Sequence, residues 1–359
     1  MSPKIAYLLS AFSVILISAE IEQDISVEES TSATLACSLK KTGQNKSYDM
    51  NGSEVTDFSF KDDGYYEAGI EGNYTRDDVR EVVTDEITGL MWQDNEEAAT
   101  VTKQWVTQAN YDDGNYSDTT GDTATTYCEN LVIDLYDDWR LPTITELMYI
   151  LDYGNATNAL DPAFAHTAQG LYWSSSDAVA TEGSAAWTID FPLGSSSYWA
   201  SKNELRHIRC VRGSFSRGKN YTRDVETQIV TDRITGLEWQ DNDVVAKNWE
   251  WAVKYCDALD LNGTGWRLPN MNELNFLVDR EKCNTAIDDV FTVANNYPYW
   301  ASTTVASDHN KIWAVNFRCG KTFTPDKNEN TFYNVRCVRG GETVHKGLVL
   351  PSVMMYLLQ

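Results

Sequence analysis

The feature that most constrains this chain is an internal duplication. The stretch Val83-Thr-Asp-Glu-Ile-Thr-Gly-Leu-Met-Trp-Gln-Asp-Asn95 recurs as Val230-Thr-Asp-Arg-Ile-Thr-Gly-Leu-Glu-Trp-Gln-Asp-Asn242. Tyr74-Thr-Arg-Asp77 recurs at the same offset as Tyr221-Thr-Arg-Asp224. Self-similarity of this kind is the signature of a repeated structural unit. The chain therefore predicts two homologous domains.

Three later motifs recur in the same order. They are Trp-Arg-Leu-Pro followed by Glu-Leu, Tyr-Trp followed by small residues, and a closing Arg-Cys-Val-Arg-Gly, which begin at Trp139 and Trp266, Tyr172 and Tyr299, and Arg209 and Arg336. The first copy also carries an insertion, 110–123, which is polar and rich in turn residues. We predict a signal peptide (1–19), a leader (20–72), a first domain (73–213), a linker (214–219), a second domain (220–340) and a tail (341–359).

The N-terminus predicts export. Lys4 is followed by an apolar run that ends at Ala19, and acidic residues follow at once, as in a cleaved signal peptide. An uncleaved anchor is the alternative, but the run is shorter than the roughly 20 residues that span a membrane. Thr34-Leu-Ala-Cys37 resembles a lipoprotein box only weakly, so we do not favour lipidation at Cys37. The apolar tail is broken by Pro351 and is also too short to span.

Within each copy, the run around Thr-Gly predicts two strands joined by a turn. Two helices follow. Ala252, Tyr255, Cys256 and Leu259 form one apolar face of the first, and capping boxes at Thr143 to Glu146 and at Asn270 to Glu273 begin the second. We expect its buried face to hold Leu147, Ile150 and Leu151, matched by Leu274, Leu277 and Val278. Strands, two helices and further strands predict an α+β fold.

Seven cysteines in a chain with an export signal predict disulfides. The first helix and the last strand of each copy carry one cysteine each, which predicts Cys128–Cys210 and Cys256–Cys337. Cys283 and Cys319 occur only in the second copy and suggest a third bridge. Cys37 is left over. Metal binding by Cys and His is the alternative that we disfavour, because no Cys-x-x-Cys pair occurs and the four His are scattered.

The charge excludes one class of partner. The chain carries 53 acidic and 29 basic side chains, a formal net charge of −24. Such a chain repels phosphate backbones, so we exclude general nucleic-acid binding and disfavour other polyanions. Hydrophobic content of 42% excludes wholesale disorder. We expect no membrane span after removal of the signal peptide, and the sequence leaves the oligomeric state open.

Taken together, the motifs resemble the Lcl C-terminal domain family of bacterial exported and surface proteins, and the resemblance covers residues 40–340. They are also similar to the C-type-lectin-like and formylglycine-generating-enzyme superfold. That implies two tandem bodies, each with two helices packed on a small, mostly antiparallel sheet. The resemblance implies attachment to carbohydrate or another surface ligand, through the loops between the second helix and the last strand, although a fold alone does not fix function.

Aromatic side chains are the candidates for such a ligand because they stack on sugars. Four matched pairs of tryptophan are expected in the core instead: Trp92/Trp239, Trp139/Trp266, Trp173/Trp300 and Trp187/Trp313. The less regular aromatics are the predicted ligand-binding residues: Trp105, Tyr198, Trp199, Trp249 and Tyr297.

A calcium site and an active site are the other readings of the sequence. Asp112, Asp113 and Asp118 offer oxygen ligands in a turn, but they lack the twelve-residue calcium-loop pattern, and the motifs of calcium-dependent lectins are absent. We therefore favour a solvated acidic loop and expect no cofactor. No hydrolase or phosphate-binding motif occurs. We expect a non-enzymatic binding protein. A sulfatase-maturase-like enzyme or an inactive relative, and a structural envelope protein, remain as alternatives.

The recurring charged residues have structural interpretations. We expect Asp85 and Asp232 to stabilise turns and Glu146 and Glu273 to cap helices. We expect four arginines to pair with buried carboxylates rather than with ligand: Arg140, Arg267, Arg209 and Arg336.

Overall fold

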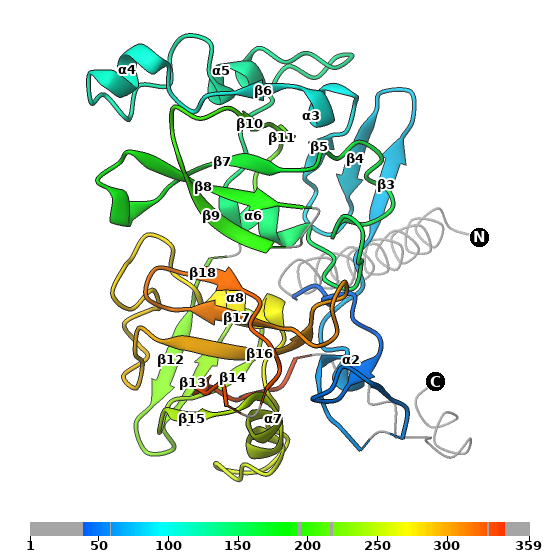
Figure 1. The fold of residues 1–359 in the computed structure, drawn as a ribbon, viewed down its shortest axis with the longest axis vertical. Coiled ribbons are helices and arrows are strands. Elements are labelled where there is room, and N and C mark those ends of the chain that lie inside the picture. The colour runs from blue at the N-terminus through cyan, green and yellow to red at the C-terminus, as the bar shows by residue number, and fades with distance from the viewer. Residues whose placement is uncertain (1–38, 58, 192–194, 216–217, 329, 342–359) are drawn as a thin grey trace, which may run out of the picture. The chain divides into compact units, whose positions relative to one another are not determined.

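The computed structural model describes residues 39–341 except 58, 192–194, 216–217 and 329. The predicted signal peptide, Cys37 and the tail beyond 341 lie outside the described residues. The described residues lie in one compact unit. Within the described part of the chain, no helix is long and apolar enough to cross a membrane. We call the segment from β3 to β11 repeat 1 and the segment from β12 to β20 repeat 2 (Figure 1).

Each repeat opens with a three-stranded meander, of which the sequence predicted the second and third strands and the Thr-Gly turn between them. In repeat 1 this is β3 (Tyr74–Asp77), β4 (Val82–Asp85) and β5 (Met91–Gln93), and the closing strand β11 (Val211–Arg212) pairs with β5. In repeat 2 the same order holds for β12 (Tyr221–Asp224), β13 (Ile229–Asp232), β14 (Glu238–Gln240) and β20 (Val338–Arg339). Neighbouring strands are antiparallel in both four-stranded sheets.

The turn between the second and third strands explains the recurring aspartate and glycine. Asp85 Oδ1 accepts hydrogen bonds from the backbone N–H of Ile87 at 3.0 Å, and Thr88 donates its hydroxyl to Asp85 Oδ2 at 2.8 Å. Gly89 has a φ of +72°, a left-handed conformation that glycine adopts without a steric penalty. Asp232 makes the equivalent bonds in repeat 2. The predicted turn function of both aspartates is confirmed.

A second, five-stranded sheet forms the body of each repeat. Its order in repeat 1 is β6 (Thr102–Lys103), β10 (Arg206–His207), β7 (Leu171–Asp177), β8 (Ala185–Asp190) and β9 (Ser195–Ser201). Repeat 2 has the same order, with β15 (Val245–Lys247), β19 (Tyr333–Val335), β16 (Pro298–Thr304), β17 (Ile312–Asn316) and β18 (Lys321–Phe323). The second and third strands in each order are parallel, and the other pairs are antiparallel.

Short helices accompany the sheets. Repeat 1 has α3 (Glu97–Thr100), α4 (Gln108–Asp112), α5 (Ala124–Glu129), α6 (Ile144–Tyr149) and the 3₁₀ turn η1 (Val179–Thr181), and repeat 2 has α7 (Trp249–Asp257) and α8 (Met271–Leu277). Both predicted capping boxes are present at the starts of α6 and α8. The predicted apolar faces of these helices are buried, although Ile150 and Leu151 follow the last residue of α6. Mixed sheets and few helices confirm the α+β class.

Three hydrophobic clusters hold the unit together. One lies within repeat 1 around Cys128, Cys210 and Trp139, and a second lies within repeat 2 around Cys256 and Cys337. All eight tryptophans expected in the core are buried. The three predicted disulfides are also present: Cys128–Cys210, Cys256–Cys337 and Cys283–Cys319.

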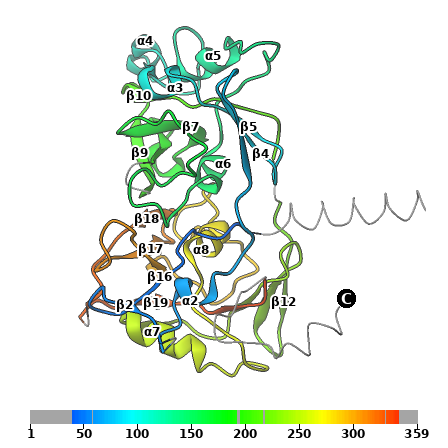
Figure 2. The same cartoon turned by 90° about the vertical axis from the view of Figure 1, so that its right-hand side faces the viewer.

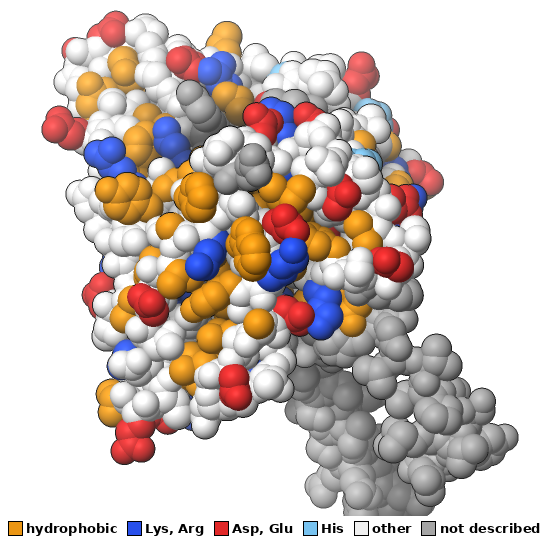
Figure 3. Space-filling view, turned by 60° about the horizontal axis from the view of Figure 1, so that its bottom comes forward, with side chains coloured by type: hydrophobic (Ala, Val, Ile, Leu, Met, Phe, Trp, Pro, Cys, Tyr) orange, Lys and Arg blue, Asp and Glu red, His pale blue; other side chains and the backbone are white. Residues whose placement is uncertain are grey.

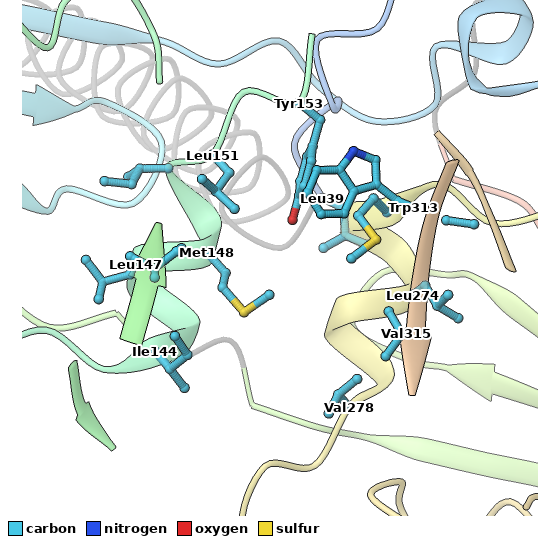
Figure 4. Close-up of a cluster of buried hydrophobic side chains, with 14 of the residues drawn as sticks. Leu39, Ile144, Leu147, Met148, Leu151, Tyr153, Leu274, Val278, Trp313 and Val315 are labelled. Carbon is cyan, nitrogen blue, oxygen red and sulfur yellow. The ribbon is translucent and has the colours of Figure 1, made fainter. Parts of the chain in front are cut away.

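The third cluster joins the two repeats. It collects apolar side chains from α6 and α8 and from the strands behind each helix (Figure 4). Tyr153 of repeat 1 packs edge-on against Trp313 of repeat 2 at 5.2 Å between ring centroids, and it accepts a hydrogen bond from Asn275 at 3.0 Å. Phe215, in the predicted linker, packs on Tyr149. The repeats therefore share a core.

The leader folds over repeat 2, although repeat 1 follows it in sequence. It contains β1 (Ser47–Tyr48), β2 (Glu54–Val55) and α2 (Asp63–Tyr66), and its course over repeat 2 is visible in Figures 1 and 2. Asn270 donates to the carbonyl of Ala68, and Asn272 donates to the carbonyls of Lys40 and Lys41. These bonds anchor both ends of the leader to the start of α8.

Candidate functional site

A shallow groove of about 720 Å³ lies on repeat 1 between α3, α5 and the end of the insertion. Its apolar part includes Leu131 and the exposed side chain of Val132. Its polar part combines two carboxylates, an ammonium group, an amide and two hydroxyl groups: Glu97, Asp122, Lys103, Asn130, Thr126 and Tyr127. This mixture of an aromatic ring with hydrogen-bonding groups is what an orienting small-molecule site requires.

Tyr127 is held in the groove by its partners. Its hydroxyl donates to Glu97 Oε2 at 2.7 Å and accepts from Gln93 Nε2 at 3.0 Å. Burial and the hydrogen bond to Glu97 raise the pKa of Tyr127, so the phenol keeps its proton. The neighbouring Cys128 is bonded to Cys210, and the capping box at Thr123 begins α5. The ring is therefore fixed on a short, doubly anchored helix.

The other polar groups of the groove come from β6, from the insertion and from the residue that follows α5. Lys103, next to β10, forms an ion pair with Asp122. Asn130 donates to the carbonyl of Thr126 at 2.7 Å and is exposed. Two carboxylates against one ammonium group leave the groove net acidic, so it disfavours anionic ligands. Hydroxyl groups of a neutral ligand suit this set, because they both donate and accept hydrogen bonds.

Part of the groove is common to both repeats and part is special to repeat 1. Tyr255 occupies the place of Tyr127 in repeat 2 and accepts from Gln240 at 2.9 Å. The insertion supplies Asp122, and Val244 stands in repeat 2 where repeat 1 has Glu97. The acidic groups of the groove therefore arose where the two copies diverge. The insertion is evident in the sequence, but the groove is not: the insertion reads as a solvated acidic loop, and its place in the groove depends on where α3 and α5 lie in the fold.

Two of the predicted ligand-binding aromatics are core residues instead, so this part of the prediction is wrong. Trp105 and Trp249 are buried, and their ring N–H groups donate to the carbonyls of Ser174 at 2.9 Å and Ala301 at 3.0 Å. Lys202 lies 3.8 Å from the ring centroid of Trp105, and Lys327 lies 4.2 Å from that of Trp249. The two tryptophans are equivalent core residues. A Lys-x-Trp match at 103–105 and 247–249 marked them in the sequence.

Trp199 and Tyr198 do not form an open platform in the described structure. Trp199 is half-buried, packs against Trp187 and has Lys321 of repeat 2 over its ring at 4.0 Å. It belongs to the contact between the repeats. The side chain of Tyr198 lies outside the described residues.

Tyr297 is exposed, and so is a second aromatic residue that was not among the predicted ones, Phe332. Tyr297 directly precedes β16 and Phe332 directly precedes β19, two strands that pair in parallel, and the residues are 67% and 59% exposed. Trp251, in the first turn of α7, is also exposed. Figure 3 shows hydrophobic side chains gathered among charged ones on the face at the end of the molecule where α7 lies. Exposure, rather than residue type, distinguishes these aromatics from core residues.

The weak calcium candidates do not converge. Asp118 accepts from the N–H and the hydroxyl of Thr120, Asp112 accepts from Gln108, and Asp113 ends α4. Among the residues that the structure describes, no three His, Cys, Asp or Glu side chains form a group able to hold a metal ion. The carboxylates of Asp112 and Asp118 therefore accept hydrogen bonds from neighbouring residues of the same segment.

The recurring arginines pair with buried carboxylates, as predicted. Arg209 contacts Asp94 at 2.7 Å and Arg336 contacts Asp241 at 3.1 Å. Burial alone would raise the pKa of Asp241, but hydrogen bonds from Arg223 and Thr292 and the charge of Arg336 lower it. These pairs connect an arginine just before the last strand of each repeat to the residue after its third strand.

Two contiguous stretches of the chain match the model of one family. The Lcl C-terminal domain matches residues 81–212 and 228–339, one stretch in each repeat. The chain belongs to the Lcl C-terminal domain family. A search of curated proteins finds no match for it.

The first Lcl C-terminal domain contains the whole groove, and the second contains Tyr297 and Phe332. Each Lcl C-terminal domain also holds its own helix-to-strand disulfide. The leader lies outside both matches, yet it is bonded to the second domain. The recognised family unit therefore includes the groove but not the segment that covers repeat 2.

Proposed function

We propose that this chain is an exported, non-enzymatic binding protein that attaches to a neutral carbohydrate through the groove on repeat 1. The observation that carries the proposal is the groove itself, which combines a fixed Tyr127 ring with carboxylate, amide and hydroxyl groups. Sugars present both an apolar face and hydroxyl groups, so they match this composition. The net charge of −24 supports a neutral ligand over a sulfated one.

We also infer that each repeat is a C-type-lectin-like body in the periplasm, at the cell surface or in the medium. Two helices beside a small, mostly antiparallel sheet support this inference. Tyr297 and Phe332 would provide a second, weaker contact on repeat 2. Two sites in one rigid unit favour attachment to a surface that carries many copies of a ligand, because the second contact is made at high effective concentration.

The enzyme alternative has less support. A sulfatase-maturase-like reaction needs reactive thiols, and the six cysteines in the described part of the chain are bonded in three disulfides. A purely structural envelope role is the remaining alternative, and it predicts no saturable ligand binding.

The test is a glycan array probed with the full chain, with and without calcium, followed by titration of the best neutral oligosaccharide. Asp122→Ala and Asn130→Ala should each weaken binding by roughly tenfold, about 1.4 kcal/mol, because each removes hydrogen bonds to ligand hydroxyls. Calcium should have no effect.

Asp289→Ala is the matched control. Asp289 is an exposed carboxylate paired with a lysine, as Asp122 is, but it lies in repeat 2. It should bind as the unaltered chain does. Absence of binding to any glycan would favour the structural role, and binding that survives both groove variants would place the site elsewhere.

A further inference from the structure

One face is covered in repeat 2 and open in repeat 1. It consists of the start of the second helix and the end of the long central strand of the five-stranded sheet. We call it the open face in repeat 1, where its residues are Arg140, Thr143, Thr145, Ser175, Ser176 and Asp177. The equivalent residues of repeat 2 are all buried: Arg267, Asn270, Asn272, Ser302, Thr303 and Thr304. The side chain of Arg140 is 35% exposed, against 3% for Arg267.

The leader is what covers this face in repeat 2. Asp63 accepts a hydrogen bond from the hydroxyl of Thr303 at 2.7 Å, and Gln44 accepts one from the backbone N–H of Thr304 at 2.6 Å. The ring of Tyr66 lies over the guanidinium of Arg267, 5.7 Å from ring centroid to Cζ. The leader therefore presents a carboxylate and an aromatic ring, both from the Asp-Gly-Tyr-Tyr turn of α2.

The same arrangement of hydrogen bonds is present in repeat 1. Arg140 holds Glu146 with two bonds, at 2.9 and 2.6 Å, just as Arg267 holds Glu273 at 2.6 and 2.5 Å. Ser176 Oγ accepts from the N–H of Ile144 at 3.1 Å, as Thr303 does from Met271. In repeat 2 the hydroxyl of Thr303 donates its hydrogen to Asp63. Among the described contacts, the hydroxyl of Ser176 has no such acceptor.

We propose that the open face of repeat 1 is a docking site for an acidic, tyrosine-containing peptide segment of another protein. Its carboxylate would accept from Ser176, and its ring would lie over Arg140, as Asp63 and Tyr66 do in repeat 2. A ring over a guanidinium and a charge-assisted hydrogen bond are each favourable. This proposal is independent of the carbohydrate groove, which involves α3, α5 and the insertion.

Two segments of this chain are poorer occupants. The preceding stretch 20–38 is acidic but contains no aromatic residue. The leader of a second copy is already held on its own repeat 2 by Asn270 and Asn272, and repeat 1 has Thr143 and Thr145 at these positions. If the leader of one copy moved to repeat 1 of another, it would lose the buried hydrogen bonds from these asparagine side chains, and the open face has no equivalent donors.

The probe is a fluorescein-labelled peptide with the sequence of residues 59–70, titrated into the full chain and followed by anisotropy. We expect saturable binding with a Kd below about 1 mM. Thr145→Trp should weaken it by at least roughly tenfold, because an indole on this exposed position covers the open face. Peptides with alanine in place of Asp63 or Tyr66 should show a similar loss.

Val225→Trp is the control, because Val225 is an exposed turn residue of repeat 2. It should leave binding unchanged. Absence of saturable binding at 1 mM, or equal binding by the Thr145→Trp variant, would overturn the proposal. Sedimentation of the peptide-free chain tests the other occupant: a concentration-dependent dimer that Thr145→Trp abolishes would show that a second copy fills the face, which also overturns it.

Discussion

Asp63 is a buried residue of the leader whose ionisation contributes to the pH dependence of stability. Burial raises its pKa to about 7, despite hydrogen bonds from Thr42 and Thr303, and the charges of Asp62 and Glu273 add to the increase. Because this value exceeds the ordinary one near 3.8, the folded chain binds the proton more tightly than the unfolded chain. The contribution of Asp63 to stability is therefore present below about pH 4 and is lost as the pH rises to about 7.

Replacement of Asp63 by Asn should remove this loss. The amide oxygen still accepts from both hydroxyls, and no charge is buried. We expect Asp63→Asn to raise the free energy of unfolding by about 1 to 3 kcal/mol at pH 8 relative to the unaltered chain, with little difference at pH 4. Urea denaturation at the two pH values measures this. An equal effect at both pH values would mean that Asp63 does not titrate in this range.

At the same scale, the sequence predicted which residues pair with one another better than it predicted which aromatic side chains are exposed. The disulfides, the turn aspartates and the arginine–carboxylate pairs followed from motifs, because each repeats with its partner at fixed spacing. The exposure of single aromatics did not follow. Trp105 is buried and Tyr297 is exposed, and residue type alone does not separate them, because burial depends on where each side chain lies in the fold.

At the scale of elements, the sequence predicted where strands and helices begin but not where the leader packs. The capping boxes and the Thr-Gly turns are local signals, so they survive without tertiary information. The two repeats offer the leader nearly identical surfaces. Repeat 2 has Asn270 and Asn272, whose amides donate hydrogen bonds to the leader, where repeat 1 has Thr143 and Thr145. That difference is visible in the sequence, but it predicts the position of the leader only when the contact between the leader and α8 is known.

Asn272→Ala tests this assignment of the leader. The change leaves the carbonyls of Lys40 and Lys41 without their amide donor in a buried place, at a cost of about 1–3 kcal/mol. Hydrogen exchange should show lost protection at the amides of Lys41 and Ile70, which pair the two ends of the leader, while the sheets stay protected. Thr145→Ala, the matched change in repeat 1, should leave the leader protected. Equal exchange in both variants would contradict the anchoring role of Asn272.

At the scale of the whole molecule, the shared core decides how the duplication behaves. Two domains on a short linker would unfold separately, but α6 and α8 contribute to one apolar cluster, and Tyr153, Asn275 and Trp313 join the repeats directly (Figure 4). If either repeat unfolded, the part of this cluster that belongs to the other repeat would lose its packing partners. We therefore expect one cooperative thermal transition for the oxidised chain.

Removal of matched disulfides distinguishes these two behaviours. Cys128→Ala with Cys210→Ala opens a loop with a sequence separation of 82, and Cys256→Ala with Cys337→Ala opens one of 81. In the chain-entropy model each loop is worth about 4 kcal/mol. If the shared core couples the repeats, either double variant lowers the same single calorimetric transition by a similar amount. Two resolved transitions, of which each variant moves only one, would mean that the repeats unfold independently despite their contact.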